Sequence, residues 1–322
     1  GEAAIKVILM AGGKGTRLRP LTCTVPKPMV PMMDRPLCEH TLRLLRKQGF
    51  YSASLTLMYL PNAVREYFGD GERVGMRLDY FVEDSPLGTA GSVLSASAGR
   101  ERTLVLSGDA LTDIDLRKAI EFHEQHGAAA TLILKEVENP LEYGVVMTDS
   151  SGRITRFIEK PEWSLALSDR VNTGIYILEP RVWEGFAKGS RFDFSMDLFP
   201  RLLERGEALY GFVAPGYWCD VGNLQQYLQA HRDILDGKCK VELPECVQGC
   251  YAEEGATLEH GAKIKGPCYL GAGCRIQSGA SVEAYSVIGR GCVVESGASV
   301  RRSVLWQGAA VRQNAELRGA VL

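Results

Sequence analysis

The sequence lacks the features that define several large classes of protein. No apolar stretch approaches the roughly 18 consecutive residues that a membrane-spanning helix needs, so we expect neither a transmembrane segment nor a membrane partner. The formal net charge is only −2 over 322 residues, which gives no overall basic field of the kind that attracts nucleic acid. We therefore expect no nucleic-acid partner, and the charges that matter for function must be local.

Disulfide and zinc frameworks are also missing from the cysteine pattern. The nine cysteines include no Cys-x-x-Cys pair and no Cys/His spacing typical of zinc sites. Their odd number, their scatter and the lack of a recognisable signal peptide predict reduced thiols in a cytoplasmic protein. Cys246 and Cys250 are the closest pair, and we interpret them as ordinary residues of a linker.

Histidine is scarce, and no histidine is paired with a serine or cysteine nucleophile. We interpret all five as structural: His40, His123, His126, His231 and His260. The first glycine-rich segment is not a P-loop, because no Gly-Lys-Ser/Thr ends it, and it is not a Gly-x-Gly-x-x-Gly turn. These absences disfavour P-loop hydrolases and dinucleotide-binding proteins.

What is present is a strand that leads into a glycine-rich loop near the N-terminus. The apolar run at residues 5–10 predicts a buried strand, and the loop after it contains Gly12, Gly13 and Gly15. Glycine lets the backbone approach a ligand closely and turn its N–H groups toward it. Such a loop suits a polyphosphate.

Basic residues follow this loop. Arg17, Arg19 and Lys27 supply cationic donors, and arginine can bind two phosphate oxygens at once. The segment at residues 8–28 closely resembles the signature of the sugar-nucleotide pyrophosphorylases. These nucleotidyltransferases make an NDP-sugar and pyrophosphate from an NTP and a sugar 1-phosphate. The resemblance implies a nucleotide-binding loop of Ala11, Gly12, Gly13, Gly15, Thr16, Arg17 and Lys27.

Short apolar strands alternate with amphipathic helices up to about residue 235. Further strands are expected at residues 53–58, 78–82, 103–106, 129–134, 144–147 and 172–178. Helices are expected from Asp34 to Gly49 and at residues 62–68, 90–98, 115–126 and 194–205. This alternation predicts an α/β fold, a Rossmann-like doubly wound and mostly parallel sheet with ligands at the C-terminal ends of its strands.

A different pattern begins near residue 251. Large aliphatic residues recur at every sixth position from Leu258 to Val300, and glycine stands three positions before most of them. The positions without that glycine are Pro267, Tyr285 and Ser303. The full period is therefore 18 residues, and a one-residue slip near Leu305 restarts the count. This period is typical of a hexapeptide parallel β-solenoid, and the resemblance to hexapeptide proteins implies a left-handed β-helix.

These patterns predict three parts of the chain. We expect a catalytic domain at residues 1–235, a linker at residues 236–250 and the left-handed β-helix at residues 251–322. Each coil of a solenoid buries its aliphatic ladder only against neighbouring coils, so a terminal coil needs a cap or a partner. Because the repeat stops at the apolar Leu322, we expect either a homo-oligomer packed through the solenoids or a chain that belongs to a longer protein.

Two aspartates stand where strands are expected to end. Asp109 closes the apolar run at residues 103–109, and its Gly-Asp position resembles the metal-binding aspartate of the family. Asp220 lies in Trp-Cys-Asp-Val-Gly, which resembles the motif of the second metal-binding aspartate. The resemblance implies that both carboxylates hold Mg²⁺, and Asp109 also belongs to the implied nucleotide site.

Further motifs resemble the part of the family's active site that binds the sugar phosphate. In Phe-Ile-Glu-Lys-Pro, Lys160 would hold the phosphate and Glu159 a sugar hydroxyl. Asn172 and Gly174 lie in Val-Asn-Thr-Gly-Ile-Tyr, which resembles the sugar-contacting motif of the family. Gly144 would let the backbone meet the sugar.

Small residues open the helix expected at residues 90–98. Gly88 and Thr89, in Leu-Gly-Thr-Ala-Gly, would let the backbone pass close to the flat base of a nucleotide. Taken without the other motifs, this segment would instead indicate a helix N-terminus packed on the sheet.

The resemblance implies a Mg²⁺-dependent nucleotidyl transfer with a catalytic set of Arg17, Lys27, Asp109, Lys160 and Asp220. The run at residues 109–113 looks most like mannose-1-phosphate guanylyltransferases, so the expected substrates are GTP and mannose 1-phosphate. Glucose 1-phosphate with UTP, dTTP or ATP is the alternative, because the motifs do not fix the base. A non-catalytic regulatory subunit is disfavoured because the basic loop and both carboxylates are retained. An acyltransferase is disfavoured because His260 is the only histidine in the solenoid.

Overall fold

The computed structural model describes residues 4–140, 143–158 and 169–322, and the chain forms two compact units. The first unit contains the residues up to Lys14, Cys23–Pro28 and Thr41–Asp220. The second contains Gly15–Thr22, Met29–His40 and Val221–Leu322. Each unit therefore draws on separate parts of the chain, and the expected boundaries at residues 235 and 251 stay a prediction.

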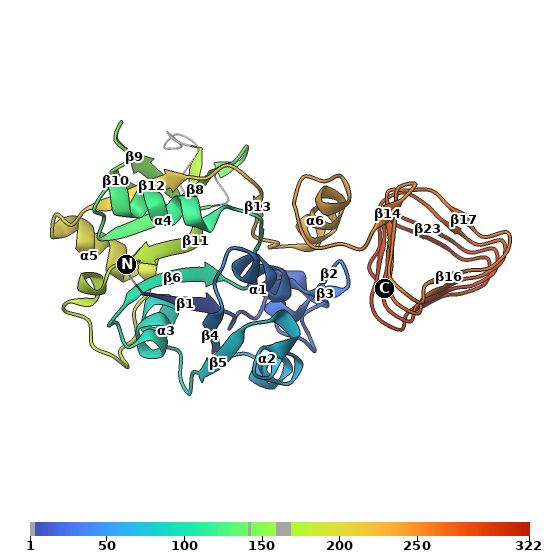
Figure 1. Ribbon diagram of the computed structural model, residues 1–322, viewed down its shortest axis with the longest axis horizontal. Helices are drawn as coiled ribbons and strands as arrows, with labels where there is room; N and C mark the ends of the chain where they lie inside the picture. The colour runs from blue at the N-terminus through green and yellow to red at the C-terminus, as the bar shows by residue number, and fades with distance from the viewer. Residues whose placement is uncertain (1–3, 141–142, 159–168) are drawn as a thin grey trace. The chain divides into compact units, whose positions relative to one another are not determined.

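A mixed sheet forms the centre of the first unit (Figure 1). Its parallel half runs in the order β6 (Arg102–Ser107), β1 (Ile5–Met10), β4 (Ser52–Leu57) and β5 (Arg77–Val82). All three pairings between these strands are parallel, as the alternating pattern predicts. Because parallel strands end at the same edge, the loops after β1, β5 and β6 meet there.

The other half of the sheet is largely antiparallel. β11 (Arg170–Leu178) lies between β6 and β8 (Ala130–Glu136) and is antiparallel to both. β12 (Leu209–Val213) extends the sheet in parallel from β8. β9 (Val145–Thr148) pairs with β11 and with β10 (Ile154–Ile158). β10 and β12 are absent from the expected strands, because each has only five residues and is only partly buried.

Helices pack against both faces of this sheet. The expected helices are found as α2 (Pro61–Phe68), α3 (Gly88–Ser97), α4 (Leu116–Gln125) and a π-helical turn, Phe194–Leu198, that continues into α5 (Phe199–Glu204). Asp115 caps α4, since its side chain accepts a hydrogen bond from the Lys118 N–H at 3.1 Å. Among the described residues, no helix is both long and apolar enough to cross a bilayer.

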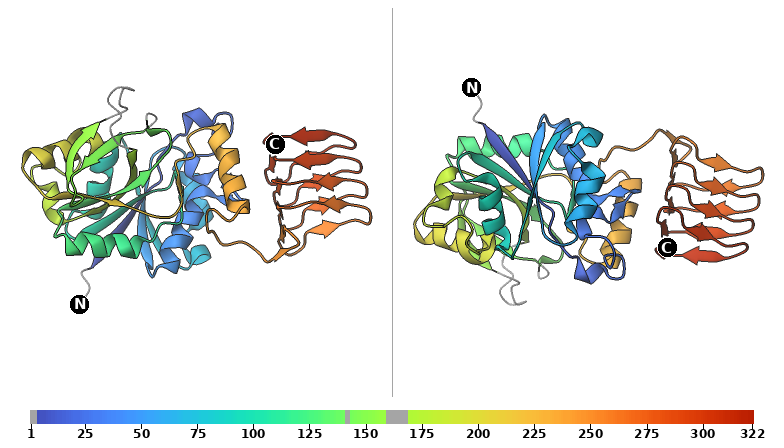
Figure 2. Two further views of the ribbon diagram at one scale, coloured as in Figure 1. Left: turned by 90° about the horizontal axis from the view of Figure 1, so that it is seen from above. Right: turned by 90° about the horizontal axis from the view of Figure 1, so that it is seen from below.

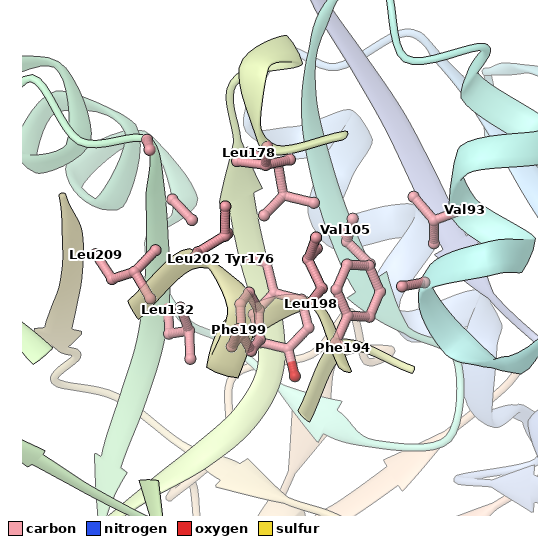
Figure 3. Packing of buried hydrophobic residues seen from close by; sticks show 14 of the residues in the cluster. Val93, Val105, Leu132, Tyr176, Leu178, Phe194, Leu198, Phe199, Leu202 and Leu209 are labelled. Carbon is pink, nitrogen blue, oxygen red and sulfur yellow. The ribbon is translucent and has the colours of Figure 1, made fainter. Parts of the chain in front are cut away.

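Aromatic rings fill the core on one face of the sheet (Figure 3). Tyr176 of β11 contacts Phe194 and Phe199, with 4.9 Å between ring centroids in each pair. Phe194 and Phe199 stack on each other at 5.6 Å, and all three side chains are buried. Their packing holds β11 against β6 next to the edge where Asp109 follows the sheet.

Short parallel strands stack into three sheets in the second unit (Figure 2). The first contains β15 (Cys250–Ala252), β18 (Cys268–Leu270), β21 (Val287–Ile288) and β24 (Val304–Leu305). The second contains β16 (Thr257–Leu258), β19 (Arg275–Ile276), β22 (Val293–Val294) and β25 (Ala310–Val311). The third contains β17 (Lys263–Ile264), β20 (Ser281–Val282), β23 (Ser299–Arg301) and β26 (Glu316–Arg318). This arrangement confirms the hexapeptide solenoid.

The strand register reproduces the sequence period. Cys250 pairs with Cys268 and Tyr269 with Val287, each 18 positions apart, whereas Val287 pairs with Val304, which is 17 positions away. The expected slip of one residue is thus present between the last two of these strands. Glycines with φ from +67° to +88° turn the corners at positions 255, 261, 273, 279, 291 and 297, as the spacing predicts.

A hairpin precedes the first long helix. β2 (Pro31–Met32) and β3 (Arg35–Pro36) are joined by Met33 and Asp34, whose φ angles are +50° and +64°. The prediction that Asp34 opens a helix is wrong, because two left-handed residues form a tight turn there. The helix α1 begins after the hairpin, at Leu37–Lys47.

Helix α6 (Leu224–Leu235) joins the hairpin to the solenoid within the second unit. The Tyr227 hydroxyl donates a hydrogen bond to the Pro31 carbonyl and accepts one from the indole N–H of Trp306 at 3.0 Å. Asp34 Oδ2 accepts a hydrogen bond from the Arg290 N–H at 2.9 Å. α6 is not among the helices expected from the sequence, although the Asn223 side chain caps it by accepting a hydrogen bond from the Gln226 N–H.

Candidate active site

Asp109 stands two residues after the end of β6 and has a desolvated carboxylate. Its Oδ1 atom is buried and has no hydrogen-bond partner among the described residues. Burial raises the pKa of Asp109, and the positive charge of Lys27 partly offsets this effect. Most buried polar atoms are satisfied, so an orphaned carboxylate oxygen beside a cavity indicates a place for a bound cation or a ligand donor.

The glycine loop makes room for this carboxylate. A Cβ atom added at Gly13 would collide with Asp109 Oδ2, so only glycine fits at this position without a shift. At Gly12 an added Cβ would lie 3.3 Å from the Met58 backbone nitrogen. The Ala11 N–H donates to the Thr56 carbonyl at 2.9 Å, which holds the start of the loop against the end of β4.

Lys27 links the loop to the second predicted aspartate. Its Nζ donates a hydrogen bond to the Asp220 carbonyl oxygen at 2.8 Å, and its N–H donates to the Gly13 carbonyl at 3.3 Å. Lys27 is buried, so its charge acts at short range on the Asp109 carboxylate. The structure therefore brings Gly13, Lys27, Asp109 and Asp220 together.

Strand pairing explains how Asp220 reaches this place. β13 (Trp218–Cys219) runs antiparallel to β7 (Leu111–Thr112), with Cys219 opposite Leu111. The next step of that register puts Asp220 opposite Ala110, the neighbour of Asp109. The Tyr143 hydroxyl lies 3.4 Å from Asp220 Oδ1 and donates to it.

A cavity of about 370 Å³ opens beside Asp109. Its lining combines the glycine loop, the ends of β4 and β6 and the start of α3, and includes Gly12, Gly13, Glu83, Gly88, Thr89, Asp109 and Arg191. A larger hollow of about 600 Å³ surrounds Ile5 and Tyr51 near the N-terminal end of β1, and its lining contains none of the predicted site residues. Ligands of parallel sheets bind at the C-terminal ends of the strands, so the smaller cavity is the candidate site.

Gly88 and Thr89 form a tightly bonded wall of that cavity. Gly88 has φ +73°, and an added Cβ would lie 2.5 Å from the Phe192 carbonyl oxygen. The Thr89 N–H donates to Asp193 Oδ1 at 2.9 Å, and its hydroxyl accepts from the Phe194 N–H at 3.0 Å. The N–H of Thr89 is thus already used within the protein.

Glu83 and Arg191 also line the cavity and are absent from the predicted site. Glu83 directly follows β5, and Asp109 follows β6 after one glycine, so a carboxylate just after a parallel strand is the signal that would have found Glu83. Burial raises the pKa of Glu83, and the Ser92 side chain and the Leu87 backbone partly offset this effect. Arg191 lies in an irregular segment, where no sequence pattern identifies it.

A bulge in β11 gathers three other predicted residues. The Asn172 N–H donates to the Gly144 carbonyl at 3.1 Å, and Asn172 Oδ1 accepts from the Gly174 N–H at 2.8 Å. Gly174 has φ +80°, and a Cβ added there would meet open space. This group lies at the edge where Asp109 ends β6, because β11 runs antiparallel to β6 with Tyr176 opposite Val105.

The rest of the glycine loop belongs to the second unit. Gly15 has φ +63° and its carbonyl accepts a hydrogen bond from the Thr22 hydroxyl at 2.7 Å, which closes the turn that carries Thr16 and Arg17. A Cβ added at Gly222 would lie 2.6 Å from Arg17 Nη2. The glycine of Trp-Cys-Asp-Val-Gly therefore leaves space for the Arg17 guanidinium.

Two predicted residues, Glu159 and Lys160, lie outside the described residues. Within the described part of the chain, no group of three or more histidine, cysteine, aspartate or glutamate side chains is arranged to hold a metal ion. The predicted carboxylates are Asp109 and Asp220, whose chain segments are brought together by the pairing of β7 with β13. This small set fits Mg²⁺, which keeps several waters and binds substrate phosphates rather than a full protein cage.

Comparison with known proteins identifies both parts of the chain. The Nucleotidyl transferase family matches residues 6–237, and the GlmU-like, C-terminal hexapeptide family matches residues 252–322. A UTP–glucose-1-phosphate uridylyltransferase of Synechocystis sp. is 39% identical over 256 residues, which cover 74% of this chain and 66% of that protein's length.

Other relatives use a different base and sugar. A mannose-1-phosphate guanylyltransferase of Mycobacterium tuberculosis is 33% identical over 270 residues, which cover 81% of this chain and 74% of that protein. The crystal structure of HddC from Yersinia pseudotuberculosis, complexed with GMP-PN, is similar with a TM-score of 0.61 and 27% identity, covering 70% of this chain and 97% of HddC. The chain belongs to the nucleotidyltransferase family and carries a hexapeptide-repeat segment after the nucleotidyltransferase fold.

Proposed function

We propose that this enzyme transfers GMP from GTP to mannose 1-phosphate, which yields GDP-mannose and pyrophosphate. A phosphate oxygen of the sugar phosphate attacks the α-phosphorus of GTP, and the bond from that phosphorus to the bridging oxygen of pyrophosphate breaks. The attacking oxygen is already anionic, so no catalytic base is needed. The protein must instead align two polyanions and offset their repulsion.

The observation that carries this proposal is the group formed by Asp109, Lys27 and Asp220. The desolvated Asp109 carboxylate lines a cavity with a glycine-rich wall, and the buried ammonium of Lys27, which acts on Asp109, binds the backbone carbonyl of Asp220. Asp109 and Asp220 would hold Mg²⁺, and the bound ion would neutralise charge on the reacting phosphates. Lys27 and Arg17 would bind the phosphates of the nucleotide together with the N–H groups of the glycine loop.

The sugar phosphate would lie near the β11 bulge. Gly144, Asn172 and Gly174 form one hydrogen-bonded group, and Tyr143 connects it to Asp220. This connection would place a sugar beside the metal carboxylates. Lys160 would bind its phosphate and Glu159 a hydroxyl, as the resemblance implies.

Glu83 supports guanine as the base. Its carboxylate lines the cavity and is oriented by Ser92 and Leu87. A carboxylate has two acceptor oxygens, and guanine presents two adjacent donors, N1–H and the N2 amino group. Uracil and thymine present one N–H between two carbonyl oxygens, which a carboxylate repels. The Synechocystis relative, named for UTP and glucose 1-phosphate, makes that pair the competing assignment.

A pyrophosphate-release assay tests the assignment. GTP, ATP, UTP and dTTP are each combined with mannose 1-phosphate and with glucose 1-phosphate, and kcat/KM is compared across the eight pairs. We expect the highest value for GTP with mannose 1-phosphate. A higher value for UTP or dTTP with glucose 1-phosphate would refute the proposed specificity while leaving nucleotidyl transfer intact.

The proposal includes a cytoplasmic homo-oligomer that packs through its solenoids. The cysteine pattern supports the cytoplasm, since no disulfide joins any of the nine cysteines in the described part of the chain. An exposed ladder residue supports packing at the solenoid, because 51% of Leu258 in the first coil is accessible to solvent.

A further inference from the structure

Two cysteines are stacked directly on each other in the first two coils of the solenoid. Cys250 of β15 pairs in register with Cys268 of β18, and adjacent strands lie roughly 4.8 Å apart. That separation falls within the range of about 4.4–6.8 Å between the Cα atoms of a disulfide. Both side chains face the solenoid interior, because Cys250 packs against the buried cluster that contains Cys268.

The stacked thiols differ in exposure. Cys268 is fully buried, whereas Cys250 lies in the first coil and is half-buried, with the two-residue strand β14 (Cys246–Val247) rather than a full coil on its other side. Further along the same column, the solenoid has Ser286 and Ser303 instead of cysteine. Cys250 is therefore the end of a short thiol pair that reagents can reach, and Cys268 is the cysteine that follows it in the column.

The neighbouring thiols also affect each other's pKa. The Cys268 side chain lowers the pKa of the Cys250 thiol more than burial raises it, whereas the Cys250 side chain and burial raise the pKa of Cys268. A thiolate is the form that attacks oxidants, so a reactive cysteine combines partial exposure with a lowered pKa. Both conditions are met at Cys250.

The solenoid contains a matched pair that lacks both conditions. Cys274 and Cys292 are also 18 residues apart, next to the paired residues Arg275 and Val293 of β19 and β22. Both side chains are fully buried, and Ala256 of the first coil lies in the preceding position of this second column. Burial raises the pKa of Cys274 to about 12 and also raises that of Cys292.

We propose that Cys250 and Cys268 form an oxidation-sensitive dithiol that closes reversibly to a disulfide across the first two coils. With a peroxide as oxidant, the Cys250 thiolate attacks one peroxide oxygen, the O–O bond breaks, and Cys250 becomes a sulfenic acid. The Cys268 sulfur then attacks the Cys250 sulfur, and the sulfenic oxygen leaves as water. Overall, two thiols and one hydrogen peroxide give one disulfide and two waters. A thiol reductant reverses the reaction.

Peptide mapping of the full-length protein tests this proposal. The reduced protein is treated with hydrogen peroxide, its remaining thiols are blocked with N-ethylmaleimide, and the unreduced digest is analysed by mass spectrometry. We expect a Cys250–Cys268 crosslink, a loss of two free thiols and a higher unfolding midpoint, all of which dithiothreitol reverses. A Cys246–Cys250 or Cys274–Cys292 crosslink, or oxidation of Cys250 without any crosslink, would overturn the proposal.

Matched variants separate the pair from its surroundings. Cys268→Ser should abolish the crosslink and let dimedone trap the sulfenic acid on Cys250. Cys292→Ser alters the matched buried pair, and Cys246→Ser removes the exposed thiol of the neighbouring strand β14 (Cys246–Val247), so both should retain the crosslink. Loss of the crosslink in Cys246→Ser would show that Cys246 takes part in it. The peptide map of the wild-type protein identifies the crosslinked cysteines independently of how any variant folds.

Discussion

The ammonium group of Lys27 donates a 2.8 Å hydrogen bond to the backbone carbonyl of Asp220, although 193 positions separate the two residues. One end of the link follows the glycine loop after β1, and the other follows β13. Lys27 also acts electrostatically on Asp109. The Lys27 ammonium therefore binds the backbone of one predicted metal ligand and acts electrostatically on the carboxylate of the other.

Replacing either predicted metal ligand should stop catalysis without unfolding the protein. Asp109→Asn and Asp220→Asn each keep the side-chain shape and remove the charge that a magnesium ion needs. We expect turnover to fall below detection while circular dichroism stays unchanged. Asp115→Asn is the matched control, because asparagine caps a helix as well as aspartate, and it should keep wild-type turnover. Near-wild-type turnover in either ligand variant would remove that residue from the metal site.

The pH dependence at Asp109 has a defined sign. Its pKa is raised by burial, so the folded protein favours the protonated form, and stability from this group is lost as pH rises through the raised pKa. Asp109→Asn should therefore have an unfolding midpoint at pH 8 at least as high as the wild type, measured by calorimetry. Metal binding needs the ionised form, so the Mg²⁺ concentration for half-maximal activity should increase as pH is lowered. A constant Mg²⁺ requirement from pH 8 to pH 5 would contradict this.

The two predicted phosphate-binding lysines should affect different substrates. Lys27→Ala should raise the KM for GTP, and Lys160→Ala should mainly raise the KM for the sugar phosphate. Loss of one charge-assisted phosphate contact costs roughly 1.5–3 kcal/mol, or about 10- to 100-fold. Steady-state kinetics with each substrate varied in turn measures both KM values. Lys118→Ala, at an exposed position of α4, serves as control. Equal effects of both variants on both substrates would disprove the assignment of roles.

Glu83 should determine the choice of base. Glu83→Gln replaces one acceptor oxygen with a donor, so the paired donors of guanine lose a partner and a pyrimidine carbonyl gains one. We expect the ratio of kcat/KM for GTP over UTP to fall roughly 10-fold or more. The exposed neighbour Asp84 lies outside the cavity lining, and Asp84→Asn should leave the ratio unchanged. An unchanged ratio in Glu83→Gln would mean that other groups read the base.

Asp34 should make the second unit sensitive to pH. Burial raises its pKa to about 6, against the effects of Arg290 and Arg35 and with a small contribution from Glu253. Stability from this group is therefore fully present below about pH 3.8 and is lost as pH rises through about 6. Asp34→Asn keeps an acceptor for the Arg290 N–H. Its free energy of unfolding should exceed that of the wild type by on the order of 1 kcal/mol at pH 8, after allowance for solvent screening, and should be nearly unchanged at pH 4.

Thermal unfolding at both pH values measures this difference. Glu254→Gln, on the exposed surface of the first coil, is the control and should show the same small effect at pH 4 and pH 8. If Asp34→Asn raised the unfolding midpoint equally at both pH values, the ionisation of a buried carboxylate would not be the cause of the stabilisation.

Much of the architecture follows from local pattern in the sequence. Apolar runs identified β1, β4 and β6, because a strand buried on both faces needs consecutive apolar residues whatever surrounds it. The 18-residue period identified the solenoid and its slip, since each coil repeats the same backbone turn. The glycine loop and the two aspartates were recognisable for a similar reason, because the chemistry of phosphates and Mg²⁺ restricts which residues can serve.

Only the tertiary structure decided which distant residues meet. Neither spacing nor composition places Lys27 on Asp220, Arg17 against Gly222 or Glu83 in the wall of a cavity, because these contacts depend on strand order and on the path of connecting segments. The same holds for Cys250. A sequence reading treats it as a linker residue beside Cys246, whereas the register of the coils stacks it on Cys268. Which distant residues become neighbours depends on the complete tertiary fold. The interactions that select this fold are distributed over the whole core and are not visible in any one segment.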